Sequence, residues 1–204
     1  MRNVLFAAAG AFVALALAFA AWLFLVPTPE YRSPAMLNAA GADIGGPFEL
    51  TAHSGERLTS ASLIDRPTLL YFGYTYCPDI CPIDTQTMVD AVEILDKKGV
   101  DVLPVFVTVD PGRDTPDELS DYVDAMHPKL IALTGSEADI RVAADAYKVF
   151  YNKVELGDSA AGYLMEHTGY TYLAVGEDKV VAIFRNGFPP EQIAADIEHV
   201  LSKL

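Results

Sequence analysis

The sequence predicts an α/β domain with a mixed central sheet and an N-terminal hairpin, preceded by one transmembrane helix. Strand-like and helix-like segments alternate along most of the chain, as they do in α/β domains. Two strand-like segments, residues 68–74 and 102–109, are almost wholly apolar, which is typical of strands buried on both faces. Near the start, an uncharged apolar run from Val4 to Val26 is long enough to cross a bilayer.

The apolar run is interpreted as an uncleaved membrane anchor over residues 1–26. A cleaved signal peptide is the alternative, because Ala18-Phe19-Ala20 resembles a small-residue cleavage site. Cleavage there would leave the apolar residues 22–26 at the new terminus, so retention is favoured. Arg2 before the run places the N-terminus inside the cell. We therefore expect a single-pass protein of the bacterial inner (cytoplasmic) membrane, with its C-terminal domain facing the periplasm.

The remainder of the chain is strongly acidic. The 204 residues include 14 basic and 28 acidic side chains, a formal net charge of −14. Such a surface repels nucleic acid, which is therefore not an expected partner. The length fits one domain with an accessory segment. Residues 27–43, which contain several prolines and alanines, are interpreted as a flexible tether, and residues 44–204 as the domain.

The first elements of the domain are short. Residues 48–51 and 56–58 flank a His-Ser-Gly turn and predict a hairpin, followed by a helical turn at 60–64. The aromatic and apolar residues 68–74 predict a buried strand. Apolar residues at helical spacing then predict a helix from Pro82 to Lys98, which ends at Gly99.

The second half continues the alternation. After the strand 102–109, Thr115 and Pro116 are a cap and a first helical residue, and predict a helix to about residue 126. A strand at 130–133 and a helix from Ser136 to Tyr147 follow. The last predicted elements are three strands and a closing helix, at residues 163–165, 170–175, 180–184 and 190–204, with a hairpin turn at 176–179.

The chain has two cysteines, Cys77 and Cys81, directly after the strand 68–74. Sites in open α/β sheets form at the carboxyl ends of strands. Because Pro82 is expected to start a helix, both thiols lie near the positive end of that helix, which should lower their pKa. A redox-active dithiol, a metal site and a structural disulfide all remain open. Three residues separate the cysteines, one more than in most thioredoxin-type enzymes, which leaves room for a third metal ligand.

His167 is the histidine whose position favours a ligand role. It precedes the strand 170–175, and the loop before that strand would face the cysteines. His53, His127 and His199 are interpreted as a turn residue, a helix C-terminal residue and an exposed helix residue. Two thiolates and one imidazole suit Cu(I), whereas structural zinc normally needs a fourth protein ligand.

Four segments carry a resemblance to a known family: GGPFEL from Gly45, YFGYTYCPDICP from Tyr71, VTVDPGRDTP from Val107, and His167 before a strand. Over residues 44–204 and the N-terminal anchor, the chain resembles the SCO/SenC family of copper-binding assembly factors of cytochrome c oxidase. The resemblance implies a thioredoxin-like fold. It also implies that Cys77, Cys81 and His167 bind copper, as Cu(I) and as Cu(II).

The resemblance further implies a metallochaperone rather than an enzyme, one that supports assembly of the dinuclear copper centre of the oxidase. Its partners would be the copper-bearing subunit of cytochrome c oxidase, and other periplasmic copper chaperones or thiol reductants. The alternative is a thiol-disulfide oxidoreductase that keeps the oxidase cysteines reduced. Glu166 stands where the family often has aspartate, and Thr168-Gly169-Tyr170 lacks the proline that borders the substrate groove of thioredoxins, which weakens the alternative.

Three charged residues follow another strand end. Asp110, Arg113 and Asp114 are interpreted either as a charge pair that orders the site loop or as a solvated loop beside the Thr115 cap. Asp79, between the cysteines, is expected to tune the thiolates or to contact a partner. Its hard carboxylate is a poor match for Cu(I).

Overall fold

The computed structural model describes residues 15, 19, 33–39, 41–78, 80–157, 162–176 and 179–204. The chain divides into two units, Met1–Arg32 and Ser33–Leu204. Apart from Leu15 and Phe19, both helical, the predicted anchor lies outside the described residues, as does Asp79. Within the described ranges, no helix is long and apolar enough to span a membrane. The architecture below is that of the second unit.

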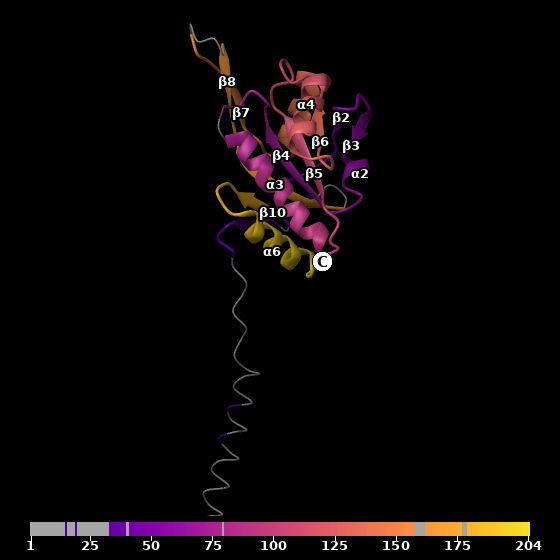
Figure 1. Ribbon diagram of the computed structural model, residues 1–204, viewed down its shortest axis with the longest axis vertical. Coiled ribbons are helices and arrows are strands. Elements are labelled where there is room, and N and C mark those ends of the chain that lie inside the picture. The colour runs from indigo at the N-terminus through magenta and orange to yellow at the C-terminus, as the bar shows by residue number, and fades with distance from the viewer. Residues whose placement is uncertain are drawn as a thin grey trace, which may run out of the picture. The chain divides into compact units, whose positions relative to one another are not determined.

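The centre of the unit is a mixed sheet (Figure 1). Among the described residues its eight strands run in the order β1-β10-β9-β4-β5-β6-β2-β3. Strands β4, β5 and β6 are parallel to one another, and the other pairs are antiparallel, which confirms the predicted mixed sheet. The strands are β1 (Met36–Asn38), β2 (Glu49–Ala52), β3 (Arg57–Thr59), β4 (Thr68–Gly73), β5 (Leu103–Thr108), β6 (Ile131–Thr134), β9 (Tyr170–Val175) and β10 (Lys179–Arg185).

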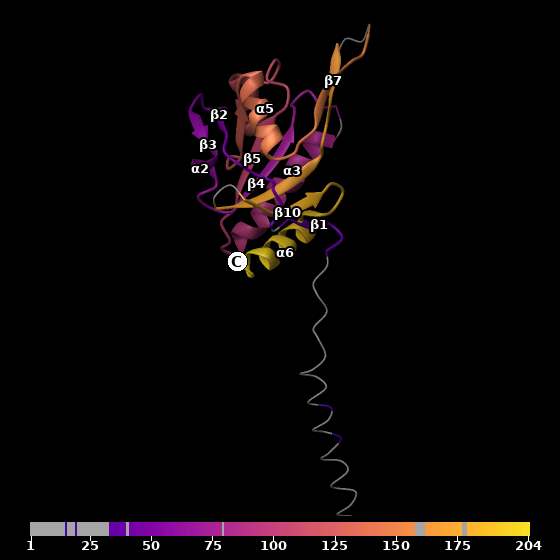
Figure 2. The same cartoon turned by 180° about the vertical axis from the view of Figure 1, so that it is seen from behind.

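Helices cover both faces of this sheet. Helices α3 and α6 pack against each other on the face seen in Figure 1, whereas α5 lies towards the viewer in Figure 2. Every residue of β4 is buried, because this central strand is covered on both sides. The helices are α2 (Ser60–Leu63), α3 (Ile80–Lys97), α4 (Pro116–Met126), α5 (Glu137–Ala146) and α6 (Pro190–Leu201).

The predicted helix starts are confirmed at two places and shifted at a third. The side chains of Thr115 and Ser136 accept hydrogen bonds from the backbone N–H groups of Glu118 and Asp139, so both act as N-caps. Helix α3 begins at Ile80, before the expected start at Pro82. Proline is tolerated in the first turn of a helix, where its missing N–H would have no intrahelical partner. Cys81 is therefore part of the helix.

Two strands were not expected from the sequence. Strand β1 pairs with β10 and lies inside residues 27–43, so the end of the expected flexible tether is instead an edge of the sheet. Strand β7 (Tyr151–Glu155) pairs with β8 (Tyr163–His167) in a separate two-stranded sheet. We call this pair the histidine ribbon, because His167 is the last residue of β8. The ribbon projects away from the main sheet (Figures 1 and 2).

Candidate metal centre

The two cysteines lie at the carboxyl end of β4, as the sequence predicts. Both are thiols; Cys81 is completely buried and Cys77 is half-buried. The backbone N–H of Cys81 donates to the Cys77 Sγ atom across 3.4 Å. The Thr85 hydroxyl donates to the Cys81 carbonyl at 2.9 Å, which anchors the first turn of α3. The fold thus brings the two sulfurs to one place through the turn between a buried strand and its helix.

His167 reaches the cysteines from the end of β8. Its Nε2 atom lies 3.2 Å from the Cys81 Sγ atom, although 86 positions separate the two residues in the chain. Its Nδ1 atom lies 3.1 Å from the Thr168 carbonyl oxygen. Because a carbonyl can only accept, this contact assigns the ring proton to Nδ1 and leaves the lone pair on Nε2. The same arrangement orients many metal-binding histidines.

Burial keeps this pair neutral in the absence of a metal ion. Desolvation raises the pKa of the Cys81 thiol, with a further contribution from the neighbouring Cys77 sulfur. The expected lowering of the Cys81 pKa is therefore wrong, because the cost of burying a thiolate exceeds the benefit of the helix end. Desolvation also lowers the pKa of His167. The Cys81 S–H group accordingly donates to a neutral imidazole.

The three expected ligands are brought into contact, but they do not form a closed site. Among the described residues, no three His, Cys, Asp or Glu side chains converge closely enough to hold a metal ion. Cys81 and His167 touch through their side chains, whereas Cys77 joins them through the Cys81 backbone. The chemistry of the donors fits a soft ion: two sulfurs and an imidazole nitrogen with an available lone pair.

The imidazole is also enclosed by tyrosines. The His167 ring meets the rings of Tyr71 and Tyr74 edge-on, with centroid separations of 6.2 and 5.9 Å. Burial, followed by the nearby Cys77 sulfur, raises the pKa of Tyr74 to about 12, so its hydroxyl stays protonated. Tyr71 and Tyr74 stand in the strand and loop before Cys77. Their aromatic side chains in the sequence predict a buried strand. That pattern does not indicate that the two rings lie beside the histidine.

Asp114 holds the loop that precedes Cys77 through hydrogen bonds to Thr75. Its carboxylate is fully buried and accepts from the Thr75 backbone N–H at 3.0 Å and from the Thr75 hydroxyl at 2.6 Å. It also accepts from the Thr108 hydroxyl at 2.5 Å, at the end of β5. The solvated-loop interpretation of Asp114 is therefore wrong. This carboxylate fixes the residue two positions before Cys77.

Arg113 connects the cysteine loop to the histidine ribbon. Its Nε atom donates to the Asp110 carboxylate at 2.5 Å. Its guanidinium lies 3.7 Å from the ring centroid of Tyr163 in β8 and 4.9 Å from that of Tyr76, the neighbour of Cys77. The Tyr163 hydroxyl also donates to Asp110 at 2.9 Å. The predicted charge pair thus exists, and the sequence did not reveal the two tyrosines that it joins.

His53 and His127 make hydrogen bonds to the backbone away from the cysteines. The Nδ1 atom of His53 accepts from the Ala132 backbone N–H at 3.3 Å. His127 is the C-cap residue of α4, as expected, and its Nδ1 atom accepts from the Lys129 backbone N–H at 3.0 Å. Both imidazoles therefore have a structural role, as acceptors of backbone hydrogen bonds.

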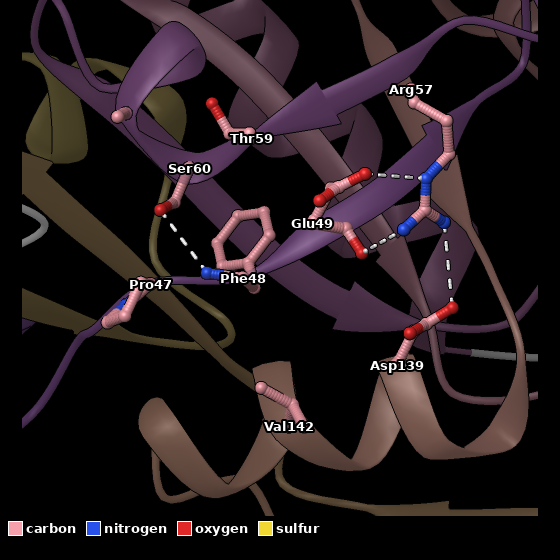
Figure 3. Close-up of a pocket in the computed structure, with 9 residues that line it drawn as sticks. Pro47, Phe48, Glu49, Arg57, Thr59, Ser60, Asp139 and Val142 are labelled. Atoms are coloured by element: carbon pink, nitrogen blue, oxygen red, sulfur yellow. Dashed lines mark hydrogen bonds and ion pairs between the residues drawn. The ribbon is translucent and has the colours of Figure 1, made fainter.

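A cavity of about 540 Å³ lies between the β2–β3 hairpin and α5, away from the cysteines (Figure 3). Its polar side is an ion-pair cluster in which Arg57 contacts Glu49 at 3.1 Å and Asp139 at 3.5 Å. All three side chains are well exposed, so these contacts stabilise the fold weakly. The cavity offers none of the soft donors found at the cysteines.

Comparisons with known proteins identify the family of the chain. The model of the SCO1/SenC family matches residues 37–202. The chain belongs to the SCO1/SenC family. It is 41% identical over 173 residues to the SCO2-like protein of Rickettsia felis, with 84% of each chain covered. It is 38% identical over 200 residues to Protein SenC of Rhodobacter capsulatus, which covers 97% of this chain and 90% of the relative.

Solved structures of the SCO1/SenC family confirm the mixed α/β, thioredoxin-like fold. The crystal structure of Arabidopsis thaliana ScoI with copper bound superposes with a TM-score of 0.74 at 40% identity, over 79% of this chain and 99% of that chain. A more distant structure is that of BsSco, described as a member of the Sco family of cytochrome c oxidase assembly proteins with a disulfide switch. It has a TM-score of 0.63 at 26% identity, over 79% of this chain and 95% of that chain.

Proposed function

We propose that this SCO1/SenC protein is a membrane-tethered copper chaperone that binds copper through Cys77, Cys81 and His167. The observation that carries this proposal is the 3.2 Å contact between the Cys81 sulfur and the His167 Nε2 atom, with the Cys77 sulfur beside them. The copper-bound state of ScoI from Arabidopsis thaliana supports the choice of ion. The chaperone would support assembly of the dinuclear copper centre of cytochrome c oxidase, in line with the family of BsSco.

The residues have separate tasks in this function. Cys77 and Cys81 supply soft thiolates, which favour Cu(I), and the imidazole adds a ligand that Cu(II) also accepts. The Thr168 carbonyl holds the imidazole in the tautomer that keeps Nε2 available. Burial of Cys81 keeps water from the bound ion. Because the ligands bind as thiolates, copper uptake releases protons.

The proposal includes the membrane arrangement expected from the sequence. Residues 1–26 anchor the protein in the bacterial inner membrane, residues 27–43 lead from the anchor, and residues 44–204 form the copper-binding domain in the periplasm. Since β1 joins the sheet at Met36, residues 36–38 belong to the sheet rather than to the tether. A short tether raises the effective concentration of the domain near a membrane-embedded copper-bearing subunit.

An anaerobic copper titration with thiol counting tests the copper proposal. The reduced protein is compared with His167→Ala and with His53→Ala, a control whose imidazole bonds to the Ala132 backbone away from the site. We expect one copper per wild-type chain, with both thiols protected, and affinity lowered by roughly 10- to 100-fold in His167→Ala but not in His53→Ala. Unchanged affinity in His167→Ala would remove the histidine from the ligand set.

A second candidate is a thiol-disulfide oxidoreductase that keeps the copper-site cysteines of the oxidase reduced. It is favoured by the two adjacent thiols and by the disulfide switch described for BsSco. This function requires the dithiol but not the imidazole. It therefore predicts that His167→Ala retains reductase activity towards an oxidised peptide from the client, whereas Cys77→Ser and Cys81→Ser lose it. Loss of activity in all three variants would argue against it.

A further inference from the structure

Exposed apolar side chains surround the candidate metal centre. Half of the large apolar side chains that are exposed in the described part of residues 33–204 lie beside the expected ligands. The others are scattered over β1, α5, β7, the loop after β7 and the C-terminus. Such a concentration around one site is typical of a surface that contacts another molecule. We call it the apolar patch, and its members are Tyr76, Ile80, Ile83, Phe150 and Tyr170.

Three members of the apolar patch belong to the cysteine side of the site. Tyr76 directly precedes Cys77, and its ring centroid lies 4.9 Å from the Arg113 guanidinium, which holds the ring while half of the side chain stays exposed. Ile80 and Ile83 are the other two. They lie three positions apart in the first turn of α3, and therefore on one face of the helix.

The other two members lie beside the imidazole. The Phe150 backbone N–H donates to the Thr168 hydroxyl at 3.1 Å, and the Thr168 N–H donates to the Phe150 carbonyl at 2.9 Å. Thr168 directly follows His167, and Tyr170 is the first residue of β9. The contact between Cys81 and His167 brings the two sides together, where α3 begins beside the base of the histidine ribbon (Figure 1).

Cys77 is the expected ligand that another molecule can reach. It is half-buried, whereas Cys81 is completely buried. A protein that takes an ion directly from this site must therefore cover Cys77 and the apolar side chains next to it. In residues 74–83 the single charged residue is Asp79. Aromatic and aliphatic side chains with few charges among them are typical of the centre of a protein–protein interface.

The helix beside the apolar patch is acidic. Helix α4 packs on α3 where the Tyr122 hydroxyl donates to the Thr85 hydroxyl at 2.9 Å, one turn beyond Cys81. It contains no lysine or arginine, and its four acidic side chains are all exposed: Asp117, Glu118, Asp121 and Asp124. This charge favours a partner with basic side chains around its contact. It disfavours a second copy of the chain, which would bring two acidic helices together, and a bilayer with anionic lipids.

We propose that the apolar patch is the docking surface for the protein that receives copper from this chain, an inference that rests on the proposed copper function. The partner presents its own copper ligands on an apolar loop, with lysine and arginine side chains around that loop. Apolar contact with the patch covers Cys77 and excludes water from it. The acidic side chains of α4 attract the basic side chains and orient the partner.

The test compares two exposed aliphatic side chains. Ile83 in α3 is 56% exposed and Val142 in α5 is 55% exposed, so Val142→Asn is a matched control for Ile83→Asn. The probe is the reduced, copper-free soluble domain of the copper-bearing subunit of cytochrome c oxidase. Its binding to the reduced, copper-free whole chain in detergent is measured by isothermal titration calorimetry. Because neither protein carries copper, this measurement reports docking alone.

We expect Ile83→Asn to weaken binding of the probe by at least about tenfold and Val142→Asn to change it by less than about twofold. Transfer of Cu(I) from the loaded chain is then followed to the probe and to bicinchoninate, a small chelator that needs no docking surface. Ile83→Asn should slow transfer to the probe and leave transfer to bicinchoninate unchanged. Equal affinity of the two variants for the probe, or no binding of the probe by wild type, would overturn the proposal.

A charge reversal tests the part assigned to α4. Asp121→Lys should lower the affinity for the probe by about fivefold at low salt and reduce its salt dependence. The control is Asp43→Lys, which changes the net charge equally. Asp43 adjoins Ile44, whose carbonyl accepts from Val180 at the end of β10 that is far from Tyr170. Equal losses in both variants would exclude α4 from the docking surface.

Two further results would assign the apolar patch to another occupant. Self-association of the chain in sedimentation equilibrium that is lost in Ile83→Asn but kept in Val142→Asn would make the occupant a second copy. Protection of residues 80–83 from amide exchange by nanodisc lipid alone would make it the bilayer. If the wild-type chain takes up no copper, the copper function fails, whereas weaker docking of Ile83→Asn than of Val142→Asn still supports the docking surface.

Discussion

The two sides of the candidate site are built in different ways. The cysteine side belongs to the centre of the domain: β4 is buried along its whole length, Cys81 is completely buried, and Asp114 holds the connecting loop with three hydrogen bonds. The histidine side is a two-stranded ribbon outside the main sheet, and most of β7 is exposed. An isolated two-stranded ribbon is marginally stable in water.

This difference suggests that the core positions the cysteines whereas a few side-chain contacts position the histidine. Arg113 stacks on Tyr163 of β8 at 3.7 Å, and Arg141 of α5 stacks on Tyr151 of β7 at 4.1 Å. Each strand of the ribbon is thus held by one arginine from the body of the domain. A site made in this way can keep its thiols in place while the imidazole joins or leaves, which the proposed copper delivery would require.

The largest expected effect is on the cysteine side, from Asp114→Ala. The substitution leaves the Thr75 N–H, the half-buried Thr75 hydroxyl and the buried Thr108 hydroxyl without their acceptor, at a cost of about 4 kcal/mol in unfolding free energy. Urea denaturation of the reduced protein measures this cost. Asp117→Ala, an exposed first-turn residue of α4, is the control and should change the unfolding free energy by less than about 1 kcal/mol. A loss of similar size in both variants would mean that the cysteine loop is not held by the core.

The second effect depends on pH and concerns Asp84. Burial places its folded-state pKa at about 6, above the usual 3.8. The folded chain therefore binds more protons than the unfolded chain between these values, and stability falls as the pH rises through that window. Asparagine does not titrate, so Asp84→Asn should match wild type near pH 4 and exceed it by up to about 3 kcal/mol at pH 7. Urea denaturation at a series of pH values measures the difference, and a gain at pH 4 as large as that at pH 7 would contradict it.

The third effect lies on the histidine side, in Tyr163→Leu. This change removes the ring that Arg113 and Lys153 contact at 3.7 and 4.0 Å, and the hydroxyl that donates to Asp110. The ribbon should open more easily by about 2 kcal/mol. Amide hydrogen exchange should accelerate in residues 151–155 and 163–167 and stay unchanged in the buried strand β4. Acceleration in β4 as well would show that the ribbon and the core unfold together.

Sequence patterns predict the structure correctly where local chemistry decides it. Caps at Thr115 and Ser136, the apolar strands β4 and β5, and the placing of Cys77 and Cys81 at a strand end follow from short-range patterns. They do not predict an element whose pairing partner is distant in the chain. β1 is three residues long and has no strand signal of its own, because its pairing with β10 supplies the stability.

The site shows the same limit. The sequence places His167 near the cysteines because the residue precedes a strand of the sheet. No local sequence pattern indicates that β7 pairs with β8 to form the ribbon that holds it. The lowered pKa expected for Cys81 followed from its helix position alone, and burial, which depends on the whole fold, reversed it. Asp84 was indistinguishable in sequence from the exposed acidic residues of α3. Its contact with Tyr71 comes from the packing of α3 on β4.

The smallest effect is expected from Arg141→Gln, which tests whether the two arginines hold the ribbon independently. Arg141 lies over the Tyr151 ring, and such a contact near the surface contributes about 0.5–1 kcal/mol. Tyr151 pairs with His167 across the ribbon, so loosening β7 should be felt at the imidazole. We expect slightly faster exchange in both strands and a small loss of copper affinity. The control is Arg66→Gln, because the Arg66 guanidinium pairs with Asp65 and Asp101 and not with the ribbon. If the effects of Tyr163→Leu and Arg141→Gln add in the double variant, the strands are held separately. If the double variant exchanges no faster than Tyr163→Leu alone, the contact between Arg113 and β8 by itself stabilises the ribbon and sets the position of His167.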